Sequence, residues 1–310
     1  NGVWPVGGSG PAIAAPTIVR RANMAISESG VVHILDVRDT GHHIVRSFQV
    51  GVWQDLGGSP LNGLPEQLVP SASDVDISMI NGNIPIVAMS AATTTGVAGA
   101  KIYVLEYTGG GSTGWSTIGG QVSDAGGPAI DPRLTVQNGT IYVTYSQDQG
   151  SDVSAVHVKR WTGSAWVAVG SASFTGVTSS QPTPVLTGTA SGELYLAYRS
   201  AANGFLVQQW NGTSWTQLGS NLLDDPGDLG GNISIALISG TPYVAWNEFA
   251  GGQSHVNLAH WTGSAWELDP QAAVSAGTDR VRLTSTGFTP WLLYRRQASI
   301  PFNLIVSILD

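Results

Sequence analysis

The chain has 310 residues, of which 11% are charged and 40 are glycine, and it contains no cysteine. The lack of cysteine excludes disulfides and thiolate metal sites, and a formal net charge of -8 argues against nucleic acid, whose binding needs a basic face. No apolar run approaches the roughly 18 residues that a membrane-spanning helix requires, so no membrane span is expected.

A tryptophan recurs along the chain at intervals of about 50 residues, which is a repeat period. The six positions are Trp4, Trp53, Trp115, Trp166, Trp215 and Trp266. In the last three copies a second tryptophan precedes it, as in Trp161-Thr-Gly-Ser-Ala-Trp166. An alternating apolar run, a turn containing glycine and a short second run predict a β-hairpin. The two aromatic residues are expected to face each other across that hairpin.

Each copy predicts four strands, of which the hairpin supplies the third and the fourth. First strands are expected at 23–28, 74–80, 133–137, 183–187, 232–238 and 280–285, each followed by a glycine. Second strands are expected at 31–36, 84–89, 141–145, 194–198, 242–246 and 291–294. Four strands in about 50 residues are typical of a β-propeller blade.

The two ends of the chain extend this prediction to the whole architecture. Residues 3–6 are expected to form a fourth strand without the first three, and residues 301–309 are expected to form a third strand without a fourth. The prediction is therefore an all-β, six-bladed β-propeller over residues 1–310 as a single domain. The N-terminal strand would complete the last blade and leave no open sheet edge there.

Charged residues on the first strands and at the ends of the second strands are the first candidates for a site. They are expected to line an axial channel or its top face, and they are Asp76, Arg133, Arg199, Glu248, Arg282 and Arg296. One interpretation is that they form structural ion pairs across the channel. The other is a pocket for an anion or a carboxylated sugar, since arginine binds carboxylates through two parallel hydrogen bonds.

The aromatic hairpins are the second candidates. They hold Trp161, Trp166, Trp210, Trp215, Trp261 and Trp266. These side chains either pack against the adjacent blade or provide repeated sugar sites, because a flat aromatic face accepts the apolar face of a pyranose ring. Weak repeated sites would gain affinity from multivalency.

Catalytic and metal motifs are not evident in the sequence. Acidic turns such as Asp224, Asp225 and Asp228 do not have the spacing of an EF-hand and are interpreted as solvated. No histidine motif, nucleophile elbow, phosphate loop or dinucleotide fingerprint occurs in a fitting context. No metal and no cofactor are therefore expected.

The stretch Trp210-Asn-Gly-Thr-Ser-Trp-Thr-Gln-Leu-Gly219 resembles the repeats of bacterial secreted β-propeller proteins. The hairpin is also similar to that of the seven-bladed bacterial fucose-binding lectins. It differs from them in blade number and in lacking their Arg-Leu-Asp and Gly-Thr-Asp-Asn stretches. Sialidases are six-bladed as well and use an arginine cluster, but their Asp-box is absent here.

Three functions remain open from the sequence. The leading hypothesis is a secreted, non-enzymatic binding or cell-surface propeller, lectin-like, whose partner is a carbohydrate or an extracellular protein. The second is a glycan-processing enzyme, a sialidase-like hydrolase with an arginine-lined axial pocket. The third is a docking subunit of a larger extracellular assembly, and the sequence leaves the oligomeric state open.

Overall fold

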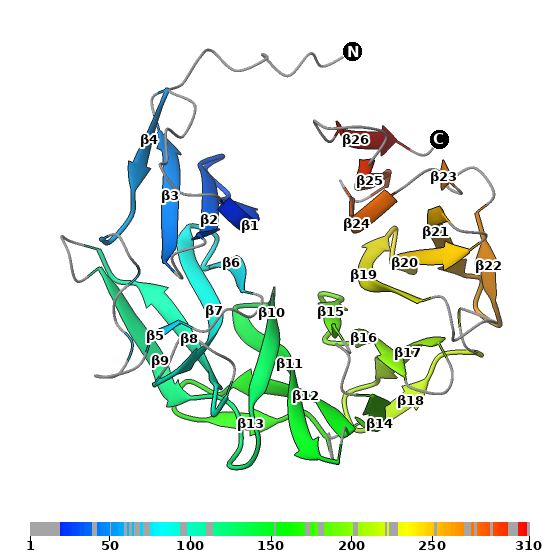
Figure 1. Cartoon of the computed structure of the whole chain (residues 1–310), viewed down its shortest axis with the longest axis horizontal. Helices are drawn as coiled ribbons and strands as arrows, with labels where there is room; N and C mark the ends of the chain where they lie inside the picture. The colour runs from blue at the N-terminus through cyan, green and yellow to red at the C-terminus, as the bar shows by residue number, and fades with distance from the viewer. Residues whose placement is uncertain are drawn as a thin grey trace. The chain divides into compact units, whose positions relative to one another are not determined.

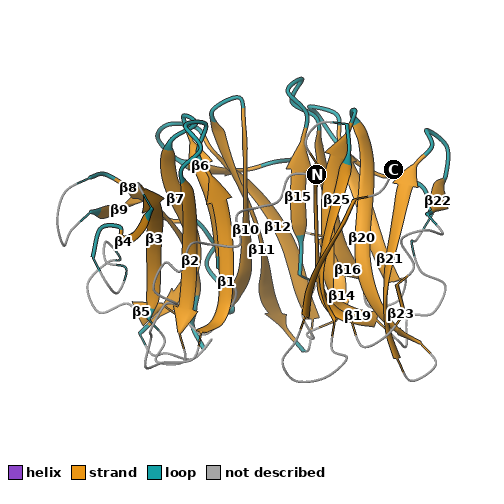
Figure 2. Ribbon diagram, turned by 90° about the horizontal axis from the view of Figure 1, so that it is seen from above, coloured by secondary structure: helices purple, strands orange, loops and turns teal. Residues whose placement is uncertain are grey.

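The computed structural model describes a chain of strands and loops. It covers residues 19–38, 42–49, 51–58, 61, 64, 69–70, 75–93, 98–109, 114–151, 153–170, 174–178, 183–200, 204–220, 222, 229–250, 253–269, 274–275, 278–285, 288–296 and 303–308. These residues form strands β1 to β26 in six sheets, and no helix occurs among them (Figures 1 and 2). The described part of the chain therefore offers no helix long and apolar enough to cross a membrane.

The chain divides into two compact units, residues 1–139 and 140–310. In the first unit, one sheet has the order β1-β2-β3-β4, with β1 (Val19–Ile26), β2 (Val32–Arg38), β3 (His43–Gln49) and β4 (Val52–Asp55). The next has the order β5-β7-β8-β9, and β6 also pairs with β7. Its strands are β5 (Val69–Pro70), β6 (Asp76–Ile80), β7 (Ile84–Ala92), β8 (Lys101–Tyr107) and β9 (Trp115–Gln121).

The first strands of the first unit lie beside one another. They are β1, β6 and β10 (Ala129–Gln137), and β6 contacts both of the others (Figure 1). A core of buried residues that includes Leu35, Ile77 and Leu105 fills the space between the first two sheets. A second strand such as β7, which reads Ile-Pro-Ile-Val-Ala-Met-Ser-Ala-Ala, is buried on both faces, as a strand between two neighbouring sheets must be.

The second unit begins with β11 (Thr140–Gly150), which follows β10 in the sheet β10-β11-β12-β13. The other strands of this sheet are β12 (Val153–Trp161), β13 (Trp166–Ala168) and β14 (Phe174–Thr178). The sheet β15-β16-β17-β18 consists of β15 (Val185–Gly188), β16 (Leu194–Ser200), β17 (Gly204–Trp210) and β18 (Trp215–Gln217).

Two further sheets complete the second unit. The sheet β19-β20-β21-β22 holds β19 (Leu229–Ile238), β20 (Thr241–Ala250), β21 (Gln253–Trp261), β22 (Trp266–Leu268) and also β23 (Val274–Ser275). The last sheet holds β24 (Thr278–Ser285), β25 (Pro290–Arg296) and β26 (Asn303–Ile308). The first strands of this unit, β15, β19 and β24, also follow one another in space, with β19 contacting both of the others.

These sheets give the chain an all-β propeller fold, but the predicted count of six blades is not reached. Five sheets hold four or five strands, as a complete blade does, whereas the sheet β24-β25-β26 holds three. The described residues thus form five complete blades. The strand expected at residues 3–6, which would complete the sixth, lies outside the described residues, so closure by the N-terminus stays a prediction.

The predicted hairpins occur with the predicted register. The opposed aromatic pairs are Phe48 and Trp53, Tyr107 and Trp115, Trp161 and Trp166, Trp210 and Trp215, and Trp261 and Trp266. The turns between first and second strands at Asn81-Gly82 and Asn138-Gly139 have positive φ at both residues. Asn138-Gly139 is a two-residue turn between Gln137 and Thr140, and positive φ at both central residues is the geometry that Asn-Gly favours there.

Short strands β14 and β23 occur between the hairpin and the next first strand, where the four predicted strands of each copy leave no place for a strand. The fourth strand β13 pairs only with residues 159–161 of β12, and β14 pairs with the part of β12 around Val153 and Val156. The strand β23 covers β21 at His255 and Val256 in the same way. An uncovered strand edge exposes unpaired backbone groups, and these short strands satisfy them.

Candidate functional site

The tryptophans of the hairpins bind the backbone of the preceding sheet. The indole nitrogen of Trp215 donates to the carbonyl of Val169 at 2.7 Å, and that of Trp266 donates to the carbonyl of Leu218 at 2.7 Å. In the first unit, Trp115 donates to the carbonyl of Leu56 at 2.8 Å. In each case the acceptor residue ends the preceding hairpin and is followed by a glycine.

That glycine lies under the aromatic pair of the next sheet. Gly219 has φ +73, and a Cβ added there would lie 2.6 Å from the ring of Trp261 and 3.1 Å from Trp266. Gly170 has φ +77 and a Cβ there would lie 2.7 Å from Trp210. Only glycine combines this backbone conformation with such a close approach. The pairs at residues 210 and 215 and at residues 261 and 266 therefore pack between successive blades.

The six hairpin tryptophans named as candidates are all half-buried. The two rings of each pair are tilted by 45° to 58°, with centroids 5.3 to 5.5 Å apart. Such tilted pairs are favourable in themselves and add to packing. Sugar binding by Trp161, Trp166 and the equivalent pairs stays a prediction.

One register position of the first strands is polar in most sheets and connects neighbouring blades. The carboxylate of Asp76 accepts a hydrogen bond from the backbone N–H of Leu134 at 2.8 Å. The Ser234 hydroxyl accepts one from the backbone N–H of Leu283 at 2.9 Å in the second unit. Asn23 occupies the same position in β1, and its side-chain amide donates to the carbonyl of Val75, directly before β6.

Arginine occupies this position in β10 and β24, with two different environments. Arg133 is buried with 8% exposure, and its Nη1 donates to the carbonyl of Pro132 at 3.1 Å. Arg282 is exposed, and its Nη1 donates to the carbonyl of Val281 at 3.3 Å. A guanidinium that is removed from water needs hydrogen-bond acceptors from the protein, so the buried Arg133 requires more such acceptors around it than the exposed Arg282.

Asp131 is a buried acid that the sequence analysis did not single out. It lies two residues before Arg133, is 6% exposed, and has φ +53. A non-glycine residue in this conformation costs about 1–3 kcal/mol and is often found at functional sites. The predicted strand began at residue 133, so Asp131 lay outside it, whereas β10 begins at Ala129. With Asp76 on β6, it places two carboxyl groups and one guanidinium on neighbouring first strands.

The second unit brings Arg199 and Glu248 to one boundary between sheets. Ala197 and Trp246 belong to the core between the two sheets, and strand alternation places Arg199 and Glu248 on the same faces, near the ends of β16 and β20. Both side chains are half-buried, and burial lowers the pKa of Arg199 because it disfavours the charged guanidinium. Among the described residues the indole nitrogen of Trp246 is buried without a hydrogen-bond partner.

The candidates of the predicted axial pocket are thus divided between the two units. Asp76 and Arg133 lie in the first unit, and Arg199, Glu248 and Arg282 lie in the second. Arg296 is paired with Thr278 and Asn303 in β25, and its side chain lies outside the described residues. A single pocket that contains all six stays a prediction. No group of three or more possible metal ligands occurs among the residues that the structure describes.

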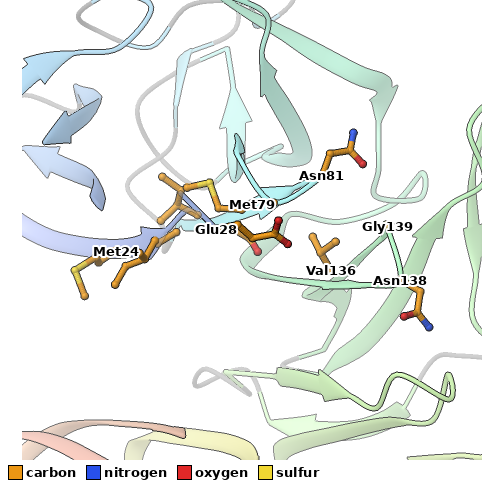
Figure 3. A pocket seen from close by; sticks show the side chains of 12 residues that line it. Met24, Glu28, Met79, Asn81, Val136, Asn138 and Gly139 are labelled. Atoms are coloured by element: carbon orange, nitrogen blue, oxygen red, sulfur yellow. The ribbon is translucent and has the colours of Figure 1, made fainter. Parts of the chain in front are cut away.

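A groove of about 640 Å³ lies toward the C-terminal ends of the first strands β1, β6 and β10 in the first unit (Figure 3). It is lined by Met24, Ala25, Ile26, Glu28, Ile77, Ser78, Met79, Asn81, Gly82, Val136, Asn138 and Gly139. Glu28 is the only ionisable residue among these described lining residues, and no pattern in the sequence predicted the groove. The pattern of polar and apolar residues describes one strand at a time. It cannot show a groove that forms between three strands.

No protein-family model matches the sequence, and no curated protein is similar enough in sequence to match it. Solved structures share the fold at 11–13% identity. An α-L-arabinanase of Penicillium chrysogenum, complexed with arabinobiose, has a TM-score of 0.55 at 13% identity, over 95% of this chain and 93% of that one. An endo-arabinase of Bacteroides thetaiotaomicron has a TM-score of 0.52 at 11% identity, over 94% of each chain.

A Hadza microbial sialidase has a TM-score of 0.59 at 12% identity. The match covers 93% of this chain and 65% of the sialidase, so this chain corresponds to part of that protein. Identities this low show a shared propeller fold and carry no function over by themselves.

Proposed function

We propose that this protein is a glycan-processing enzyme that hydrolyses glycosidic bonds. The carrying observation is that Asp76 on β6 and both Asp131 and Arg133 on β10 lie on two first strands that contact each other. The fold supports this proposal, because the arabinanase, endo-arabinase and sialidase that share it are named for action on glycans. The enzymatic hypothesis is therefore better supported than the lectin-like one.

Glycoside hydrolysis needs two carboxyl groups, one to protonate the leaving oxygen and one to act as base or nucleophile. The backbone N–H of Leu134 donates to Asp76 at 2.8 Å, which favours the ionised form and suits a base or nucleophile. Asp131 is buried, which suits a carboxyl group that delivers a proton. Arg133, two residues further along β10, would bind a carboxylate or hydroxyl group of the sugar.

Hydrolysis of a small substrate panel tests this proposal. The panel consists of 4-methylumbelliferyl α-L-arabinofuranoside, the corresponding N-acetylneuraminic acid glycoside, and arabinan. We expect turnover of at least one member, and we expect Asp76→Asn and Asp131→Asn to reduce kcat at least about 100-fold. Asn keeps the size of Asp, and in Asp76→Asn it keeps an acceptor for Leu134.

Asp124→Asn is the matched control, since it removes one exposed carboxylate from a turn of the same unit. It should leave kcat unchanged. An intact protein that hydrolyses nothing in the panel but binds immobilised glycans would contradict the enzymatic proposal and support a lectin-like function. In that case the hairpin tryptophans become the first residues to substitute.

The place and partners of the protein stay predictions from sequence. We propose a secreted or cell-surface protein that meets a carbohydrate or an extracellular protein. Recovery of the protein from culture medium, rather than from the cell extract, tests the location.

A further inference from the structure

The groove of the first unit has a composition that selects one kind of ligand. Its walls are formed by Met24, Ile26, Met79 and Val136, together with Ala25 and Ile77. Met24 is 61% and Ile26 is 52% exposed, which are high values for large apolar side chains. Apolar walls in a hollow of about 640 Å³ favour a ligand with an aliphatic or other apolar body.

A single carboxylate sets the charge of the groove. Glu28 is exposed, and its carboxyl group lies over Gly82, where an added Cβ would come within 2.3 Å of it. Its backbone N–H also donates to the carbonyl of Gly82 at 2.7 Å, so the residue is held against the neighbouring turn. In Figure 3, Met24 and Met79 are seen on one side of this carboxylate and Val136 on the other.

The remaining polar groups are neutral. They are the hydroxyl of Ser78 and the amides of Asn81 and Asn138, and both asparagines are fixed in tight turns with φ +50. None of the lining residues that the structure describes is lysine, arginine or histidine. An anionic ligand would therefore meet a carboxylate without a compensating cation, in a chain whose formal net charge is -8.

We infer that this groove binds an alkylammonium group, which places its aliphatic chain against Met24 and Met79 and its charge at Glu28. A methionine side chain adapts its shape to an aliphatic chain, and a carboxylate accepts hydrogen bonds from an ammonium group. Two sources carry this chemistry, a lysine side chain of a protein segment and a free aliphatic diamine. This inference does not depend on the proposed hydrolysis, which uses the opposite ends of the same strands.

Methionine methyl NMR tests the inference directly, since the chain has three methionines. Met24 and Met79 line the groove, and Met89 is fully buried in the core and serves as an internal control. With protein labelled at the methionine methyl groups, we expect N-acetyl-lysine methylamide to shift Met24 and Met79 in a saturable manner and leave Met89 unchanged. The uncharged analogue N-acetyl-norleucine methylamide should shift them much less at equal concentration.

Two variants separate charge at the groove from charge elsewhere. Glu28→Gln should weaken binding of the lysine probe about two- to fivefold, the range for an exposed ion pair. Glu267→Gln, which removes an exposed carboxylate in the second unit, should not change it. Cadaverine as a second probe decides the source: equal affinity points to free amines, and weaker affinity points to a peptide.

Three results would overturn the inference. They are the absence of shifts at Met24 and Met79, equal shifts with the norleucine probe, or unchanged binding in Glu28→Gln. A folded variant is recognised by an unchanged Met89 signal, so a loss of binding through unfolding would not be mistaken for support.

Discussion

The outer hairpins and the first strands of this propeller repeat in different ways. In the hairpins, the same residue types return with the same contacts, as with Trp215 on Val169 and Trp266 on Leu218. In the first strands, one register position holds an amide, a carboxylate, a guanidinium or a hydroxyl, as at Asn23, Asp76 and Arg133. The repeat thus keeps one interblade contact the same in the hairpins, and it varies the polar group that connects neighbouring blades in the first strands.

The largest expected effect concerns the glycine under the aromatic pair. Gly219→Ala should lower the free energy of unfolding by about 2–4 kcal/mol, because it adds the strain of positive φ to a collision with Trp261. Gly212→Ala is the matched control, since Gly212 has φ +101 but nothing within 4 Å of an added Cβ. It should lose about 1 kcal/mol in urea denaturation. Equal losses would show that the tryptophans do not enclose the glycine.

A smaller effect is expected from the indole hydrogen bond. Trp266→Phe keeps an aromatic ring but leaves the carbonyl of Leu218 without its donor, which should cost about 1–2 kcal/mol. Trp215→Phe removes the equivalent bond to Val169 and should cost a similar amount. Chemical denaturation of both variants measures this. Unchanged denaturation midpoints would mean that the buried apolar area of the ring, and not the indole hydrogen bond, stabilises the contact between a hairpin and the preceding sheet.

The smallest effect is expected in the first strands. Ser234→Ala leaves the backbone N–H of Leu283 without its acceptor and should cost about 1 kcal/mol. Ser214→Ala, in an exposed turn, should cost nothing measurable. If Ser234→Ala proved as costly as Gly219→Ala, the first strands would hold the blades together as strongly as the hairpins, and the contrast between the two regions would disappear.

The repeating parts of the fold could be predicted from sequence because local pattern determines them. Alternation and turn chemistry are local, so the pairing of Trp161 with Trp166 and the Asn138-Gly139 turn were both accessible. The contact of Trp215 with Val169 was not, since it joins residues 46 positions apart through a backbone carbonyl. The short strand β14 was missed because its pairing depends on how much of β12 the preceding strand leaves uncovered.

Only part of the candidate site could be predicted from the sequence. Polar residues at a strand position predicted Asp76 and Arg133, because charge stands out against an apolar pattern. Asp131 was missed, since its left-handed backbone conformation interrupts the extended geometry that alternation assumes. The groove beside Glu28 was missed as well, because a hollow arises from three strands together and leaves no mark on any one of them.

The contact between a tryptophan and the preceding glycine has a direction. Each blade presents one surface to its predecessor and a different, complementary surface to its successor, which is a heterologous interface of the kind that propagates from copy to copy. A fragment that ends after Gly219 would lose Trp266, and the carbonyl of Leu218 and the surface at Gly219 would be left without the hairpin that covers them. A chain shortened at this point should therefore expose an interblade surface and associate with other copies more readily than the whole chain, whereas exchanging whole blades in register should preserve solubility.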